Sequence, residues 1–319
     1  MTKAFHALCG EKWAIDPSWL PLLATIAQRG NVSAAGSDDV RKWVQRDHLA
    51  AAGQGAQKLA GAYRGFTVGR TGILPITGPI FPRANMLTEI SGATSLTMLQ
   101  ADHQIMLGSR DIDNILMTID SPGGAVSGIA ATVHMIARGA KSKPTHAFVT
   151  GSAASAAYWI ASSASRISAD RSAMLGCIGV VAACPKQVEP DQDGIIDIEI
   201  VSSNAPNKRP DPQTDGGVQV IRQTLDDLEA IFISDVARGR GVPVSKVIAE
   251  FGQGGVKVGS AAVRAGMADA IETQDMAMRT LQLKPGQRSA QQSTAIGSSG
   301  GITQRQENLR RLAELRRRR

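Results

Sequence analysis

The sequence has few aromatic residues and few cysteines. Aromatic residues make up only 4% of its 319 residues, and it has three cysteines: Cys9, Cys177 and Cys184. Three cysteines without a metal-binding spacing argue against a disulfide framework and a zinc site, and they fit a reducing compartment. Because Cys177 and Cys184 lie in an apolar stretch, we expect both to be buried thiols that do no chemistry.

Long hydrophobic runs are also missing. No window reaches the ~18 consecutive apolar residues of a membrane helix. The first 16 residues, MTKAFHALCGEKWAID, lack the apolar core of a secretory signal. We therefore expect a cytoplasmic protein without membrane contact, in which 43% apolar residues supply one large core or two modest ones.

Positive charge is confined to one end of the chain. Residues 281–319 hold nine basic and two acidic residues, which accounts for the whole net charge of +7. Nucleic acid could therefore bind only through this tail, and a solvated chain end is the simpler interpretation.

Three segments differ in pattern, and we expect each to be a separate unit. Residues 1–68 predict a helical N-terminal extension, 69–280 an α/β domain, and 281–319 a flexible linker and basic tail. The α/β class follows from strands that alternate with helices along residues 69–280. The expected strands are 73–80 (broken by a Gly-Pro turn), 112–119, 146–150, 166–169, 178–183, 195–202 and 268–271. The expected helices are 17–29, 40–49, 94–107, 125–138, 155–163, 218–238, 244–251 and 260–265.

Two turns follow predicted strands and carry the candidate chemistry. The first is DSPGG at residues 120–124, whose glycines leave backbone amides open to an anion such as a developing oxyanion. The second is GSAASAAYW at residues 151–159, in which small residues flank Ser155 and let a substrate carbonyl approach. At the start of a helix, the amides of Ser155 and of the next residue are expected to point toward that oxyanion. One helix and one strand separate the turns, so both should reach the same edge of a sheet.

A serine nucleophile needs a general base. The five histidines are His6, His48, His103, His134 and His146, and none follows Ser155, so a triad with a downstream histidine is impossible. His146 lies inside a predicted strand, where we expect a structural role. A lysine whose pKa is lowered by burial is the remaining candidate, either Lys208 in a loop after a strand or Lys186 in CPKQVEP.

This combination resembles the signal peptide peptidase A family of Ser/Lys proteases, within it the phage capsid-assembly (prohead) branch. The matching elements span about two-thirds of the chain: DSPGG, GSAASAAYW, LGCIGVV at 175–181, and a lysine 53 residues after the serine. The resemblance implies a Clp-protease/crotonase-like β-β-α superhelix, usually a homo-oligomer, with no metal or cofactor.

Carried over by position, the resemblance implies Ser155 as the nucleophile and Lys208 as the base. It implies an oxyanion hole from the amides of Gly124 and Ala156, with Gly123 at the substrate. Gly176, Cys177, Ile178 and Gly179 would belong to an edge that pairs with an extended peptide. The family usually has glycines after the nucleophile, where this chain has Ala156 and Ala157; alanine still supplies the amide, and we expect a tighter pocket.

The phage branch implies scaffold, portal or coat proteins as substrates, and cleavage of the chain itself, inside an immature capsid in the host cytoplasm. Three alternatives stay open. They are a signal-peptide-peptidase-like enzyme that degrades membrane-derived peptides, a non-catalytic capsid scaffolding protein, and a crotonase-type acyl-CoA enzyme. The last would leave Ser155 and Lys208 unexplained.

Overall fold

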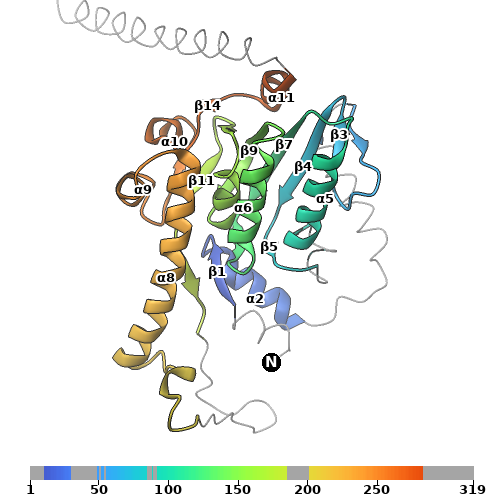
Figure 1. Cartoon of the computed structure of the whole chain (residues 1–319). Helices are drawn as coiled ribbons and strands as arrows, with labels where there is room; N and C mark the ends of the chain where they lie inside the picture. Colours follow the sequence, from blue (N-terminus) through green and yellow to red (C-terminus); the bar gives the residue numbers. More distant parts are fainter. Residues whose placement is uncertain are drawn as a thin grey trace, which may run out of the picture.

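Parallel strands at the centre of a twisted sheet organise the protein (Figure 1). The computed structural model describes residues 11–29, 49, 52–53, 55–84, 88, 92–184 and 201–282. Within them, the large sheet has the order β13-β11-β9-β7-β4-β3-β2, and β10 joins β9 and β14 beside it. Its strands are β2 (Gln57–Lys58), β3 (Phe66–Val68), β4 (Thr71–Thr77), β7 (Asn114–Ser121), β9 (Thr145–Ala154), β10 (Arg166–Ala169), β11 (Met174–Gly176), β13 (Val256–Val258) and β14 (Ala270–Ile271).

The middle of this sheet is parallel and apolar on both faces. β4 pairs with β7, β7 with β9, and β9 with both β10 and β11, all in parallel. The apolar run of β7 is buried throughout its first six residues, as expected for a strand covered on both faces. Antiparallel β2, β3 and β13 occur only toward the sheet edges.

Helices cover the two faces of the sheet. The described helices, not all of which lie on this sheet, are α2 (Trp19–Arg29), α5 (Leu96–Gly108), α6 (Ile129–Gly139), α7 (Ala156–Ala161), η1 (Pro206–Lys208), α8 (Asp215–Arg240), α9 (Val244–Glu250), α10 (Ser260–Ala265) and α11 (Gln274–Gln282). α5, α6 and α8 lie in front of the sheet in Figure 1. Trp159 of α7 stacks on Phe232 of α8 with ring centroids 4.4 Å apart. The other face carries α11, whose Ala277 and Leu281 pack with Leu116.

A second, smaller sheet lies at the carboxyl ends of the large sheet's strands. Its order is β12-β1-β8-β5-β6. The strands are β12 (Val181–Ala182), β1 (Lys12–Ile15), β8 (Gly123–Ala125), β5 (Ile80–Phe81) and β6 (Thr94–Ser95). β5 and β8 continue the chain soon after β4 and β7, so the small sheet is attached directly to the ends of the parallel strands.

Most expected elements form close to their predicted bounds. The α/β class is confirmed, and 166–169 and 260–265 form a strand and a helix at the predicted residues. The described part of residues 1–68 holds the strands β1, β2 and β3 as well as the helix α2, and much of the predicted helical extension lies outside the described residues. The SPGG stretch, expected to be only a turn, includes strand β8. α11 was not expected, and most of the predicted 40–49 helix and 195–202 strand, with all of 283–319, lies outside the described residues.

Candidate active site

The two candidate turns meet at one edge of the large sheet. β7 and β9 are parallel neighbours, and Ser121 pairs with Ala153 beyond a register shift in β7. The Asp120 carboxylate accepts a hydrogen bond from the Ser152 amide at 2.9 Å, which ties the two strand ends together. The sheet edge thus holds DSPGG directly beside the turn that carries Ser155.

Ser155 has a strained backbone at the junction between β9 and α7. It is the N-cap of α7, and its φ of 54° and ψ of −119° are rare for a residue with a side chain. A sharp strand-to-helix turn also holds the nucleophile in the α/β-hydrolase fold. Only 1% of Ser155 is exposed, and its Oγ lies 3.5 Å from the Gly179 carbonyl oxygen.

One amide at this turn has a different role from the one expected. The Ser155 N–H donates to the Gly176 carbonyl at 2.6 Å, so it is not directed at a bound oxyanion. Ala156 is the first residue of α7, where a backbone amide has no partner within the helix. Of these two amides, that of Ser155 is taken by Gly176, and that of Ala156 stays the expected oxyanion donor.

Glycines allow β8 to approach Ser155 closely. Gly123 has a φ of 98°, and a side-chain carbon built on it would lie 3.0 Å from the Cβ of Ser155 and 2.9 Å from the Ala154 carbonyl oxygen. A side-chain carbon on Gly124 would collide with the carbonyl oxygen of Ile80 in neighbouring β5. Both glycines are thus required by close backbone approach.

The segment expected to hold a peptide lies on the other side of Ser155. Gly176 of β11 pairs with Ala154, and Cys177, with a φ of 54°, donates its amide to Gly255 at 2.8 Å. Burial, with a smaller contribution from the charge of Asp16, raises the pKa of the Cys177 thiol to about 11. Cys177 is therefore a buried thiol as expected, whereas Cys184 is exposed and that expectation is wrong.

The segment leading into α8 carries Lys208. This residue ends η1 and is exposed, and η1 extends below the body of the protein in Figure 1. Among the contacts of the described residues, none joins Lys208 to Ser155. The single chain thus does not bring the expected nucleophile and base together, and Lys186 lies outside the described residues.

Two further features at the site could not be read from the residue pattern. Strand β1 lies between β8 and β12 and covers Gly123 and Gly124. Its short apolar stretch gave no periodicity to recognise. The carboxylate of Glu229 in α8 lies close to Gly179, because a side-chain carbon built on Gly179 would be 3.5 Å from its oxygen. Burial raises the pKa of this carboxyl.

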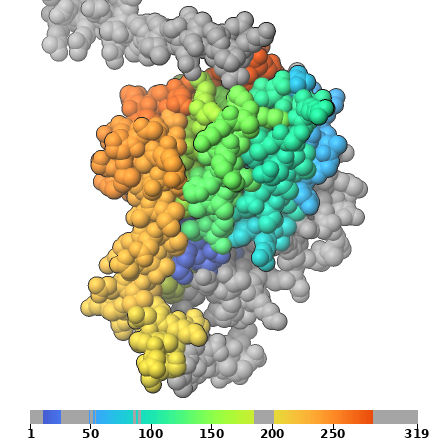
Figure 2. Space-filling model, in the orientation of Figure 1, coloured from blue at the N-terminus to red at the C-terminus, as the bar shows by residue number. Residues whose placement is uncertain are grey.

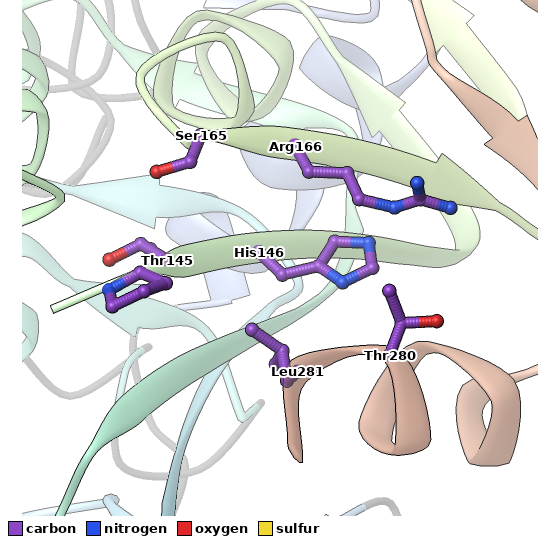
Figure 3. A pocket seen from close by; sticks show the side chains of 7 residues that line it. Thr145, His146, Ser165, Arg166, Thr280 and Leu281 are labelled. Atoms are coloured by element: carbon purple, nitrogen blue, oxygen red, sulfur yellow. The ribbon is translucent and has the colours of Figure 1, made fainter. Parts of the chain in front are cut away.

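One cavity among the described residues lies away from Ser155. It has a volume of about 180 Å³ and lies where β9 and β10 begin, against Thr280 and Leu281 of α11 (Figure 3). His146 lines it, is 1% exposed and lies 2.7 Å from the Ser168 hydroxyl. These contacts fit a structural histidine at the opposite end of β9 from Ser155.

Comparison with known proteins identifies the domain that holds Ser155. A family model described as peptidase family S49 matches residues 137–288, a range that includes Ser155 and Lys208. The chain contains a peptidase family S49 domain. This bears out the resemblance to the signal peptide peptidase A family, and the S49 match begins within α6.

Three curated relatives of the S49 chain are proteins of phages and a bacterium. It is 28% identical over 226 residues to the head-tail preconnector protein GP5 of Enterobacteria phage P21, covering 68% of this chain and 43% of that protein. It is 27% identical over 202 residues to the capsid assembly protease C of Escherichia phage lambda, covering 62% and 46%. It is 25% identical over 236 residues to Protease 4 of Haemophilus influenzae, covering 70% and 36%. The chain spans less than half the length of each.

No helix in the described ranges is both long enough and apolar enough to span a bilayer. Among the same residues, no group of three or more His, Cys, Asp or Glu side chains is arranged to hold a metal ion.

Proposed function

We propose that this protein is a serine endopeptidase of phage capsid assembly, with Ser155 as its nucleophile. The observation that carries the proposal is the strained backbone of Ser155 at the end of β9, directly beside Gly123 and Gly124 at the start of β8. Its position in an S49 domain and the names of the phage relatives support it. The parallel β4-β7-β9-β11 order, with helices between strands, supports a Clp-protease/crotonase-like arrangement.

In this mechanism, Ser155 Oγ attacks the substrate carbonyl carbon while a neutral lysine takes the hydroxyl proton. The amides of Gly124 and Ala156 donate to the oxygen that becomes negative, which is where preorganised donors lower the barrier most. The lysine then protonates the leaving amine, and water hydrolyses the acyl-enzyme. A lysine can act this way only if its surroundings lower its pKa.

Lys208, the proposed base, is exposed in the single chain. A general base must lie within reach of the proton that it removes, and no contact among the described residues joins Lys208 to Ser155. We therefore expect assembly with other copies to bury Lys208, with a neighbouring copy supplying it to Ser155. Such an arrangement makes activity depend on oligomer formation.

Cleavage assays on purified variants test the catalytic part of the proposal. Ser155→Ala and Lys208→Ala should each lower cleavage by at least ~100-fold, whereas Lys186→Ala and the surface control Lys246→Ala should not. If Lys186→Ala is inactive and Lys208→Ala is active, the base is misassigned. If Ser155→Ala cleaves normally, the protein is not a protease of this type.

A mixing experiment tests where the base comes from. Inactive Ser155→Ala and inactive Lys208→Ala chains are co-assembled, and cleavage is measured. Recovery of activity is expected, because some sites then combine an intact serine with an intact lysine from the neighbouring copy. No recovery in a demonstrated mixed oligomer would contradict a base supplied between copies.

Substrates are tested by co-expression with the scaffold, portal and coat proteins of the same phage. Ser155-dependent cleavage of any of them is the expected result. Cleavage of membrane-derived peptides alone would favour the role suggested by the name Protease 4. Capsid assembly that proceeds equally with Ser155→Ala would favour a scaffolding role.

A further inference from the structure

Strand β1 fills the space between two strands that border Ser155. It pairs antiparallel with β8 on one side, with Ala14 opposite Gly124, and antiparallel with β12 on the other, with Trp13 opposite Val181. Extended peptides bind many proteins by adding a strand in this way. The chain's own residues 12–15 therefore occupy the position that a strand-like peptide substrate would take.

The register of β1 brings one of its carbonyl groups to the nucleophile. Val126 donates its amide to the Lys12 carbonyl at 2.9 Å, and Asp16 donates to the Pro122 carbonyl at 2.8 Å. In an antiparallel pair, bonded and non-bonded residues alternate, so the Ala14 carbonyl between them faces the Gly124 amide. That amide is one of the two proposed oxyanion donors.

The distance to Ser155 is short. A side-chain carbon built on Gly123 would lie 2.3 Å from the carbonyl oxygen of Ala14 and 3.0 Å from the Cβ of Ser155. These two atoms therefore border the same small space. The Ala14 carbonyl is thus beside the nucleophile, on the side of the proposed oxyanion hole. Of the three consecutive buried residues of β1, Ala14 is the one aligned with this chemistry.

Side chains on either side of Ala14 hold the strand in this register. Trp13 is 2% exposed and meets Phe81 edge-on, with ring centroids 6.1 Å apart. Ile15 is also 2% exposed and packs in the same cluster as Leu23 of α2. Ala14 itself is 0% exposed and belongs to the main buried cluster, so a longer side chain at this position would have to displace its neighbours. Figure 2 shows the blue N-terminal segment at the lower edge of the body, beneath the green elements.

We infer that β1 is an internal substrate and that the protein cuts its own chain between Ala14 and Ile15. This inference rests on the proposed function, since it requires Ser155 to be the nucleophile. The Ser155 hydroxyl gives its proton to the base as Oγ bonds to the Ala14 carbonyl carbon. The bond to the Ile15 nitrogen then breaks, and that nitrogen takes the proton. Water hydrolyses the Ala14 ester, which leaves an Ala14 carboxylate and a free Ile15 amine.

Cleavage would also open the site to other chains. Residues 12–14 would then be held only by strand pairing and by the packing of Trp13, without a covalent link to α2. Their release would free the edges of β8 and β12 for a second peptide. Self-cleavage would therefore precede efficient cleavage of other proteins.

The test is intact-mass analysis and N-terminal sequencing of the purified full chain. The wild type should show a new N-terminus at Ile15, and Ser155→Ala should keep Ala14 joined to Ile15. Ala14→Leu should slow self-cleavage by at least ~10-fold, because the position has no room for the longer side chain. The matched control, Ala131→Leu on the exposed surface of α6, should cut itself like the wild type.

Cleavage of a second protein, added separately, distinguishes failure of the inference from failure of the proposed function. A wild-type chain that stays intact after Ala14 while it cuts the second protein in a Ser155-dependent manner overturns the inference alone. Cutting after Ala14 that persists in Ser155→Ala also overturns it. A wild type that cuts neither itself nor the second protein overturns both.

Discussion

Replacing His103 by leucine should make the protein less sensitive to acid. His103 lies on α5, is 0% exposed, and packs so closely on α6 that a side-chain carbon on Gly139 would lie 2.6 Å from its ring. Neither ring nitrogen has a hydrogen-bond partner within the described residues. Burial therefore lowers the pKa of His103 from 6.5 to about 4, and the folded protein keeps the ring neutral.

The size of the effect follows from these two pKa values. Between pH 6.5 and about 4 the unfolded chain binds a proton at this position and the folded chain does not. The contribution of His103 to the free energy of unfolding is therefore complete above pH 6.5 and is lost as the pH falls through this window. At about pH 4.5 the loss relative to about pH 7 is roughly 2 kcal/mol.

Urea unfolding at these two pH values measures the effect. The free energy of unfolding of His103→Leu should fall less than that of the wild type on acidification, by roughly 2 kcal/mol. The control is Ala131→Leu, an exposed position of α6 without a titratable side chain, whose replacement should leave the pH dependence unchanged. Equal pH dependence in the wild type and His103→Leu would refute the reasoning.

Three further predictions concern the loop at residues 63–65, the two described thiols, and Gly123 beside the nucleophile turn. Asp102→Ala should lower the free energy of unfolding, measured in urea, by about 3 kcal/mol. The buried Asp102 carboxylate accepts hydrogen bonds from the three backbone amides of residues 63–65 at 2.6 to 2.8 Å, and the substitution leaves them without a partner. A loss below about 1 kcal/mol would contradict this. Cys177, whose pKa is raised to about 11, should react with iodoacetamide at about pH 8 far more slowly than exposed Cys184, and equal rates would contradict its burial. Gly123→Ala should lower peptide cleavage at least ~100-fold, since the added carbon meets the nucleophile turn at an unfavourable φ; full activity would contradict the close approach.

The sequence was sufficient to predict elements whose pattern is strong and local. The apolar run within β7 and the amphipathic spacing of α6 each dictate their own structure. The small residues around Ser155 predicted a sharp turn at a strand end. They could not predict its φ of 54°, which depends on how the surrounding sheet and helix constrain that residue.

Features that depend on long-range pairing were beyond the sequence. The three apolar residues in the Lys12–Ile15 stretch are too few to show periodicity, and they become a strand only because β8 and β12 offer two open edges. Likewise, the family resemblance implies a Ser155–Lys208 pair that the single chain does not form. Contacts supplied by another copy leave no mark in the periodicity of the chain.

The central claim is that Ser155 is the nucleophile. Its most direct test is to treat the wild-type protein with a fluorophosphonate, digest it, and locate the modified residue by mass spectrometry. The account predicts a single phosphonylated serine, Ser155, with no labelling in Ser155→Ala. Labelling of another serine, or equal labelling of the Ser155→Ala protein, would contradict it.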